Sequence, residues 1–258
     1  MLEDAQIGNP EKARWTAGLK LLALTLAAAN ALLLVLHLCI YWWHLIPLPF
    51  LWKMFDLGSE CNVPTWFASI LWFLVAMAAL LSYALDLRAG KSSGNWIWLL
   101  IALAFVVASV DEVASLHEEV GSFLKAQARQ PGLLSALPAG SPDSPWIVFY
   151  SPVLLAFSLV AGLFLWRRLS WSKWLRVCIV LAAECYLIAI GLDYFQGLPA
   201  ALQQPLAIAL DLQRKYLLET TIAVEEMLEN IGTSLLLLAL AAYAGRSLGR
   251  KGNTDRKL

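Results

Sequence analysis

Long apolar stretches separated by short polar segments dominate this sequence. Six of them are long enough to cross the hydrocarbon core of a bilayer, which takes roughly 20 apolar residues in a helix. We therefore expect an all-α fold: a polytopic membrane protein with a bundle of about six transmembrane helices, forming a single domain over residues 1–258. The predicted spans cover residues 18–43, 64–86, 95–118, 146–166, 174–195 and 220–244.

The composition supports a membrane protein. The chain is 60% hydrophobic and only 15% charged, whereas soluble domains are nearer half apolar and a quarter charged. The formal net charge is zero, so no basic field argues for nucleic acid as a partner, and the lipid bilayer is the partner we expect. The first apolar stretch is too long for the apolar region of a signal peptide, which favours an uncleaved span.

The distribution of Lys and Arg predicts the orientation, because cytoplasmic loops carry the excess of these residues. With six spans, both termini share one side, and 14 of the 19 Lys and Arg residues fall on that side. Both termini are therefore predicted to be cytoplasmic. The residues on that side are Lys12, Arg14, Lys20, Arg88, Lys91, Arg167, Arg168, Lys173, Arg176, Arg246, Arg250, Lys251, Arg256 and Lys257.

Two long connections lie on the other, outer side. Residues 119–145 contain several prolines and are predicted to be largely irregular. Residues 196–219 look partly helical, either as an amphipathic segment on the membrane surface or as an outward extension of the last span. Cys39 and Cys61 also fall toward this side, where an oxidising environment permits a disulfide.

Three acids in the last predicted span are the strongest functional signal. At about 100° per residue, Glu225, Glu226 and Glu229 lie within about 100° of one another on the helix, so they share a face. An acid at the centre of a membrane helix costs roughly 2.5–3.5 kcal/mol on insertion scales. The alternative is that the span begins later and these acids are solvated. Otherwise a cation, a proton, a partner side chain or a water-filled cavity must offset the free-energy cost, and a functional site is the default hypothesis.

A second group lies near the outer end of the third predicted span. It contains Asp111, Glu112, His117 and Glu118. On one straight helix His117 points about 100° away from Glu118, so the two side chains would not reach one point. The alternative is a solvated helix end just outside the membrane, where acids carry little penalty.

Weaker candidates are Asp193, at the outer end of the fifth span, and His37 and His44, near the outer end of the first. Asp193 is equally well explained as a residue that ends its helix. His37 is equally well explained by hydrogen bonding within the bundle, and His44 by the membrane interface. Glu184 lies near the middle of the fifth span, where a hydrogen bond to a neighbouring helix is the simplest interpretation.

Carboxylates grouped with histidine are the donors that a divalent metal takes, and Zn, Mn or Fe suits this mixture. Without a cation, such carboxylates would instead hold protons. The function we expect is a metal-dependent hydrolase or transferase acting on a lipid-like or periplasmic substrate. The alternatives are a proton- or cation-coupled transporter, and a non-catalytic assembly or sensing protein in which the polar groups only join the helices.

Two short motifs carry a resemblance. The third span runs into DE-x4-HE, here Asp111-Glu112 to His117-Glu118, and the last contains EE-x-x-E-x-x-G, which ends at Gly232. In these motifs and in its hydropathy the chain resembles a group of uncharacterised bacterial multi-pass membrane proteins. The resemblance implies a bacterial inner membrane and brings no activity with it.

Overall fold

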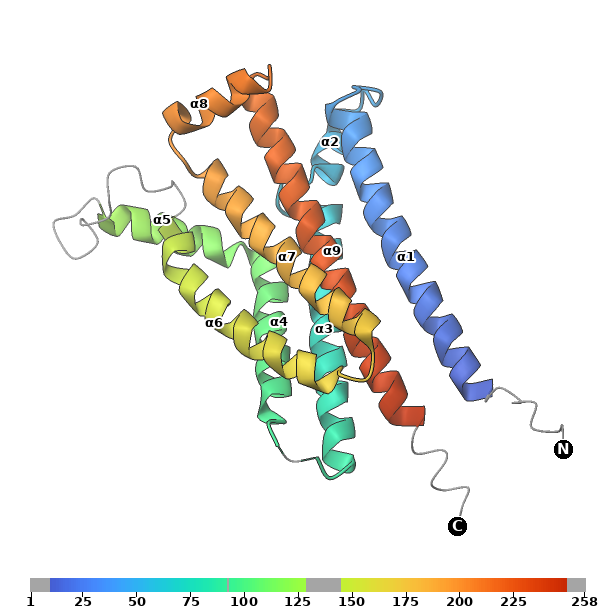
Figure 1. Cartoon of the computed structure of the whole chain (residues 1–258). Coiled ribbons are helices and arrows are strands. Elements are labelled where there is room, and N and C mark those ends of the chain that lie inside the picture. Colours follow the sequence, from blue (N-terminus) through green and yellow to red (C-terminus); the bar gives the residue numbers. More distant parts are fainter. Residues whose placement is uncertain (1–9, 92, 129–144, 250–258) are drawn as a thin grey trace, which may run out of the picture.

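The computed structural model describes residues 10–91, 93–128 and 145–249. All regular secondary structure within these residues is helical (Figure 1). The helices are α1 (Pro10–Tyr41), α2 (Pro49–Phe55), α3 (Val63–Arg88), α4 (Trp96–Ala114), α5 (Leu116–Ala128), α6 (Pro145–Arg168), α7 (Lys173–Gln196), α8 (Ala200–Ala209) and α9 (Arg214–Gly249).

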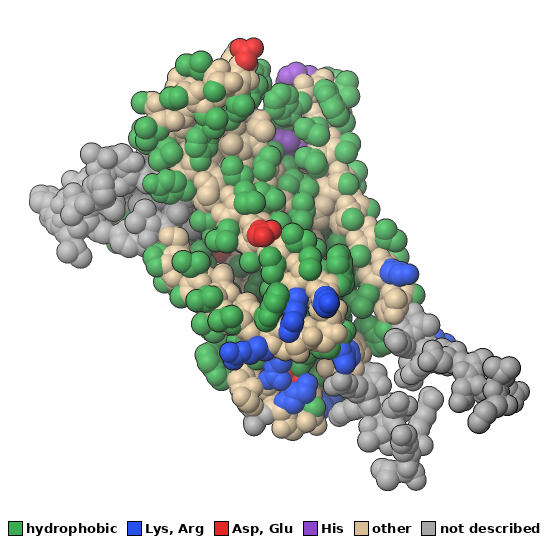
Figure 2. Space-filling model, viewed as in Figure 1, with side chains coloured by type: hydrophobic (Ala, Val, Ile, Leu, Met, Phe, Trp, Pro, Cys, Tyr) green, Lys and Arg blue, Asp and Glu red, His purple; other side chains and the backbone are tan. Residues whose placement is uncertain are grey.

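Among the described residues, six helices are long and apolar enough to cross a membrane: α1, α3, α4, α6, α7 and α9. The predicted all-α bundle with six spans is thereby confirmed. Many large apolar side chains point outward from these helices, as lipid-facing surfaces require; Leu21, Leu103 and Leu155 are 67%, 61% and 61% exposed. Figure 2 shows apolar side chains along the sides of the bundle.

The third span differs from the prediction. It was expected to continue to residue 118, but α4 ends at Ala114 and Ser115 adopts a left-handed conformation with φ 49°. The cause lies in the Asp111 side chain, which accepts a hydrogen bond from the backbone N–H of His117 at 2.8 Å. Such side-chain bonds compete with continuation of a helix. The chain resumes as α5, in the first part of the predicted loop, whose residues 129–144 lie outside the described residues.

The segment before the last span contains a short helix and an outward extension of the last helix; a position of the short helix on the membrane surface stays a prediction. A short helix, α8, covers Ala200–Ala209, and α9 begins at Arg214 rather than at residue 220. With 36 residues, α9 is about 54 Å long at 1.5 Å per residue, which exceeds the roughly 30 Å hydrocarbon core. The other helix outside the spans, α2, was not predicted; it begins at Pro49, a residue suited to the first turn of a helix.

Helix α9 is the central element, because it packs against α7, α3 and α1, while α3 also packs along α4 (Figure 1). Gly232 permits the close contact with α7: a Cβ atom at this position would lie 3.2 Å from Cys185 Cβ and 3.3 Å from the Ala182 carbonyl oxygen. Small residues allow such approaches between membrane helices. In the same way, the hydroxyls of Ser69 and Ser109 each donate to the other residue's carbonyl, joining α3 to α4.

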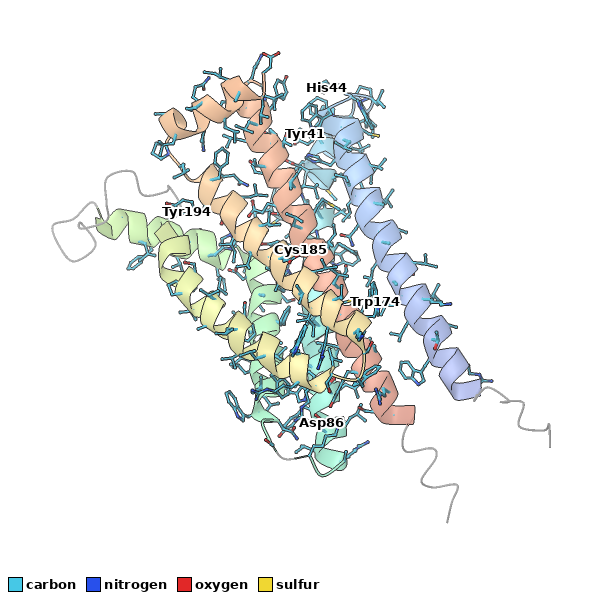
Figure 3. The ribbon with its side chains drawn as sticks, viewed as in Figure 1. Tyr41, His44, Asp86, Trp174, Cys185 and Tyr194 are labelled. Atoms are coloured by element: carbon cyan, nitrogen blue, oxygen red, sulfur yellow. The ribbon has the colours of Figure 1, made fainter. Side chains whose placement is uncertain are left out.

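The two ends of the bundle differ in charge. Helices α2 and α8 lie at one end, here named the outer end, while α1 begins and α9 finishes at the opposite, inner end (Figure 1). Figure 2 shows Lys and Arg side chains gathered toward the inner end. Figure 3 shows Tyr41 and His44 at the outer end and Asp86 at the inner end. Because α1 begins and α9 finishes at the same end, the bundle fits an even number of crossings, such as six.

Candidate functional site

Toward the outer end of the bundle, seven carboxylates and one imidazole each lie within electrostatic reach of at least one other member of the group. They come from the α2–α3 loop, α4, α5, α7 and α9, and every one of these side chains is half-buried. We name this group the outer acidic cluster. Its members are Glu60, Asp111, Glu112, His117, Asp193, Glu225, Glu226 and Glu229.

The three acids of α9 lie well inside that helix, since Glu225 is eleven residues beyond its first residue, Arg214. The last residue of α7, Gln196, donates a hydrogen bond to Glu225 Oε2 at 2.6 Å. Glu225 is therefore level with the outer end of a neighbouring span, and Glu226 and Glu229 lie deeper. The position of these acids within the membrane-spanning part of α9 stays a prediction, because α9 is longer than one crossing needs.

Helix α4 contributes an acid to the region around Glu226 and Glu229. The charge of Glu112 interacts with those of Glu229 and Glu60, and Glu226 interacts with Glu229, Glu112 and Glu225. Asp193 of α7 is a neighbour of both Glu225 and Glu229. The fold thus brings together the acids predicted from three separate spans.

The break at Ser115 decides the position of His117. The imidazole Nδ1 lies 3.0 Å from Asp111 Oδ2, while the other oxygen of Asp111 accepts the His117 backbone N–H. One carboxylate therefore fixes both the backbone and the ring of this histidine. A carboxylate that orients an imidazole is the usual support for a metal-ligating or proton-transferring histidine.

Glu60 is the member that the sequence did not point to. It lies in the loop between α2 and α3, and no spacing connects it with the acids of the spans. Its Oε2 atom is buried without a hydrogen-bond partner. Because a buried carboxylate oxygen is costly without a donor or a cation, a proton or a bound cation would stabilise Glu60.

Beneath the cluster the polar groups continue for one turn of α9. Thr233 donates to the Glu229 carbonyl oxygen at 2.7 Å and lies 2.8 Å from the Tyr186 hydroxyl. The Tyr186 ring stacks on Trp72 with 5.5 Å between centroids. Further inward, α9 becomes apolar: Leu236, Leu237, Ala239 and Leu240 are at most 7% exposed. Polar groups on this helix therefore give way to an apolar layer.

The weaker candidates have other surroundings, apart from Asp193. His37 is buried, stacks on Tyr41 at 4.8 Å and accepts the Leu57 backbone N–H at 3.4 Å. His44 is exposed in the turn after α1. Glu184 is exposed on α7, so the expected buried hydrogen bond is not needed.

Two further predictions from the sequence concern Glu118 and the cysteines. Glu118 lies on α5, but its side chain is outside the described residues. Cys39 and Cys61 are both free thiols, so the disulfide considered from the sequence is not formed.

The donor set of the outer acidic cluster suits a divalent metal, since it combines carboxylate oxygens with imidazole. The side chains nevertheless stand apart: within the described residues, no three His, Cys, Asp or Glu side chains are grouped as a metal site requires. Binding of an ion would therefore require the carboxylates to turn toward it.

A second polar network, at the inner end, was not predicted. Asp86 is fully buried, and its carboxylate accepts hydrogen bonds from Tyr243 at 2.6 Å, Lys91 at 2.9 Å and Trp98 at 3.0 Å, with Arg168 at 3.2 Å. We name these five residues the inner network. Burial alone would lower the pKa of Lys91, but the bonds to Asp86 and Tyr243 outweigh it and raise this pKa above its usual value. The network joins α3, α4, α6 and α9.

Comparison with known proteins identifies a family, but the function of that family is unknown. The family described as "Domain of unknown function (DUF8692)" matches residues 21–244, which is most of the chain, so the chain belongs to this family. The comparisons with curated proteins and with solved structures gave no match. A functional assignment must therefore rest on the site itself.

Proposed function

We propose that this member of the DUF8692 family, residing in a bacterial inner membrane, binds a divalent metal ion in the outer acidic cluster and uses it in hydrolysis or group transfer. The substrate would be lipid-like or periplasmic, because the cluster lies toward the end of the bundle that we predict to face outward. One observation carries the proposal: seven half-buried carboxylates lie in one region, where the charge of His117 acts on Glu112, Glu225 and Glu229.

The charge balance supports a bound cation. Crowded carboxylates repel one another, and partial burial strengthens the repulsion because the surrounding dielectric is lower than that of water. The unpartnered oxygen of Glu60 lies in the same neighbourhood as Glu112 and Glu226. A divalent ion would satisfy this oxygen and reduce the repulsion together.

The supporting residues also fit a catalytic use. Asp111 holds the ring of His117 in a fixed orientation, and half-buried side chains remain accessible to water. A metal in this site would supply Lewis-acid activation of a water molecule or a substrate carbonyl or phosphoryl group. A carboxylate that is not needed as a ligand would then accept the proton.

The test is the metal content of protein purified in mild detergent without chelators, measured by mass spectrometry. We expect near-stoichiometric Zn, Mn or Fe in the wild type and less than about a tenth of it in a Glu226→Gln/Glu229→Gln variant, since these changes remove two anionic ligands. A Glu184→Gln/Asp211→Asn variant removes two exposed acids elsewhere and should keep its metal.

The identity of the metal then separates hydrolytic from redox chemistry. Wild-type protein that stays metal-free after incubation with Zn, Mn and Fe would refute the proposal. If the cluster variant then lost thermal stability and nothing else, the carboxylates would act only in assembly of the bundle.

A proton- or cation-coupled transporter is the second candidate, favoured by the polar contacts of Tyr186 and Thr233 that lead inward from Glu229. A transporter needs a polar path through the whole membrane. Inward of Tyr186 and Thr233, the buried residues of α9 from Leu236 to Leu240 are apolar and offer no such path. The first proposal is therefore preferred. Ion flux into liposomes that is abolished by Glu226→Gln would reverse this preference.

A further inference from the structure

A cavity of about 210 Å³ opens at the inner end of the bundle, far along α9 from the outer acidic cluster. Four of its seven lining residues are cations, and no Asp or Glu lines it within the described part of the chain. We name it the basic pocket. Its lining residues are Lys91, Arg167, Arg168, Trp171, Tyr243, Arg246 and Ser247.

The positive charge of the basic pocket exceeds what its nearest acid balances. Asp86, buried behind the lining, shares its single negative charge between Lys91 at 2.9 Å and Arg168 at 3.2 Å. Arg167, which is exposed, adds a third cation to Lys91 and Arg168, so these three already exceed the single charge of Asp86. Arg246 stacks over the Trp171 indole at 4.0 Å. The pocket therefore suits an anion that accepts several hydrogen bonds.

The groups are also held in place. Arg168 donates to the Ser93 carbonyl oxygen at 2.8 Å and to the Asn95 side chain at 2.7 Å, so its guanidinium is fixed at the pocket wall. Lys91 donates to the Tyr243 hydroxyl at 3.1 Å. A preorganised set of Arg and Lys donors is what recognition of a phosphate group requires. The cavity volume is many times the roughly 10–15 Å³ that one water needs on this measure, which leaves room for a phosphate ester.

The setting indicates which phosphate ester the pocket meets. Trp166, Trp171 and Trp174 surround the α6–α7 turn with 42%, 42% and 64% exposure, as expected at a membrane interface. A second cavity of about 290 Å³ adjoins the same turn, where Lys173 and Arg176 flank the apolar side chains of α7. Cations beside an apolar groove match a lipid headgroup and its acyl chain. Basic pockets between membrane helices commonly hold anionic headgroups.

We propose that the basic pocket binds the phosphate headgroup of an anionic membrane lipid. The pocket lies at the inner end, so the lipid would come from the leaflet that we predict to be cytoplasmic. This binding is independent of the chemistry proposed for the outer acidic cluster.

The test is titration of delipidated protein, in neutral detergent, with dioleoyl phosphatidylglycerol, with dioleoyl phosphatidylcholine as the zwitterionic comparison of zero net charge. Native mass spectrometry measures the bound lipid. An Arg167→Gln/Arg246→Gln variant should bind phosphatidylglycerol roughly 30-fold more weakly, which corresponds to about 2 kcal/mol for two cations near an anionic lipid. An Arg14→Gln/Arg88→Gln variant removes two exposed arginines elsewhere and should change the affinity less than about threefold.

Folding is checked by the melting temperature without lipid. If the double variant is unstable, the exposed Arg167 alone replaced by Gln should still weaken binding about fivefold. Equal loss in both double variants, or equal affinity for the two lipids, would overturn the proposal. A third arm uses glycerol 3-phosphate: if this soluble phosphate ester binds as tightly as the lipid, the pocket is a site for a soluble anion and the lipid assignment is wrong.

Discussion

Replacement of Asp86 by Ala should destabilise the bundle more than replacement of any acid in the outer cluster, because the inner network depends on this one carboxylate. The change leaves the Trp98 indole N–H, 0% exposed, and the Tyr243 hydroxyl, in a side chain 4% exposed, without their acceptor. Each buried unsatisfied donor costs about 1–3 kcal/mol. Removing one partner of a buried ion pair costs about 3–5 kcal/mol, so we expect a loss of about 3–5 kcal/mol in the free energy of unfolding.

Circular dichroism during unfolding of the protein in mixed micelles by sodium dodecyl sulfate measures this loss. Asp86→Asn should be milder, at about 1–3 kcal/mol, since an amide oxygen can still accept from Tyr243. Glu184→Gln changes an exposed acid and should stay within about 0.5 kcal/mol. Combining Asp86→Ala with Tyr243→Phe should cost less than the sum of the two single changes, because they share one hydrogen bond.

A loss below about 1 kcal/mol for Asp86→Ala would refute this reasoning. It would mean that water reaches the carboxylate and that the network contributes no more than a surface ion pair.

Two further predictions concern packing and orientation. Gly232→Leu should destabilise the protein by about 1–3 kcal/mol, since a Cβ added there would lie 3.2 Å from Cys185 Cβ. Gly191→Leu, where an added Cβ would have no atom within 4 Å, should be nearly neutral in the same unfolding assay. A membrane-impermeant maleimide should label the exposed thiol of Cys61 in right-side-out vesicles, and Cys61→Ser should abolish that signal; labelling confined to inverted vesicles would reverse the predicted orientation.

The hydrophobic pattern alone determined the fold class and the number of spans, because a bilayer imposes a minimum apolar length on every helix that crosses it. It also pointed to Glu225, Glu226 and Glu229, since acids within such a stretch carry a large penalty wherever the helices pack. Helix ends were less certain. The capture of the His117 amide by Asp111 ended α4 early, and hydropathy does not register a bond of this kind.

Only the tertiary structure decided which polar groups meet. Glu60 joins the outer acidic cluster from a loop, and Tyr243 reaches Asp86 across 157 residues of sequence. Apolar residues give the same hydropathy pattern whether they face lipid or another helix, so the sequence does not show which helix faces pack together. Pairing between distant positions follows from that packing. The spans are therefore a property of the sequence, whereas the outer acidic cluster, the inner network and the basic pocket are properties of the fold.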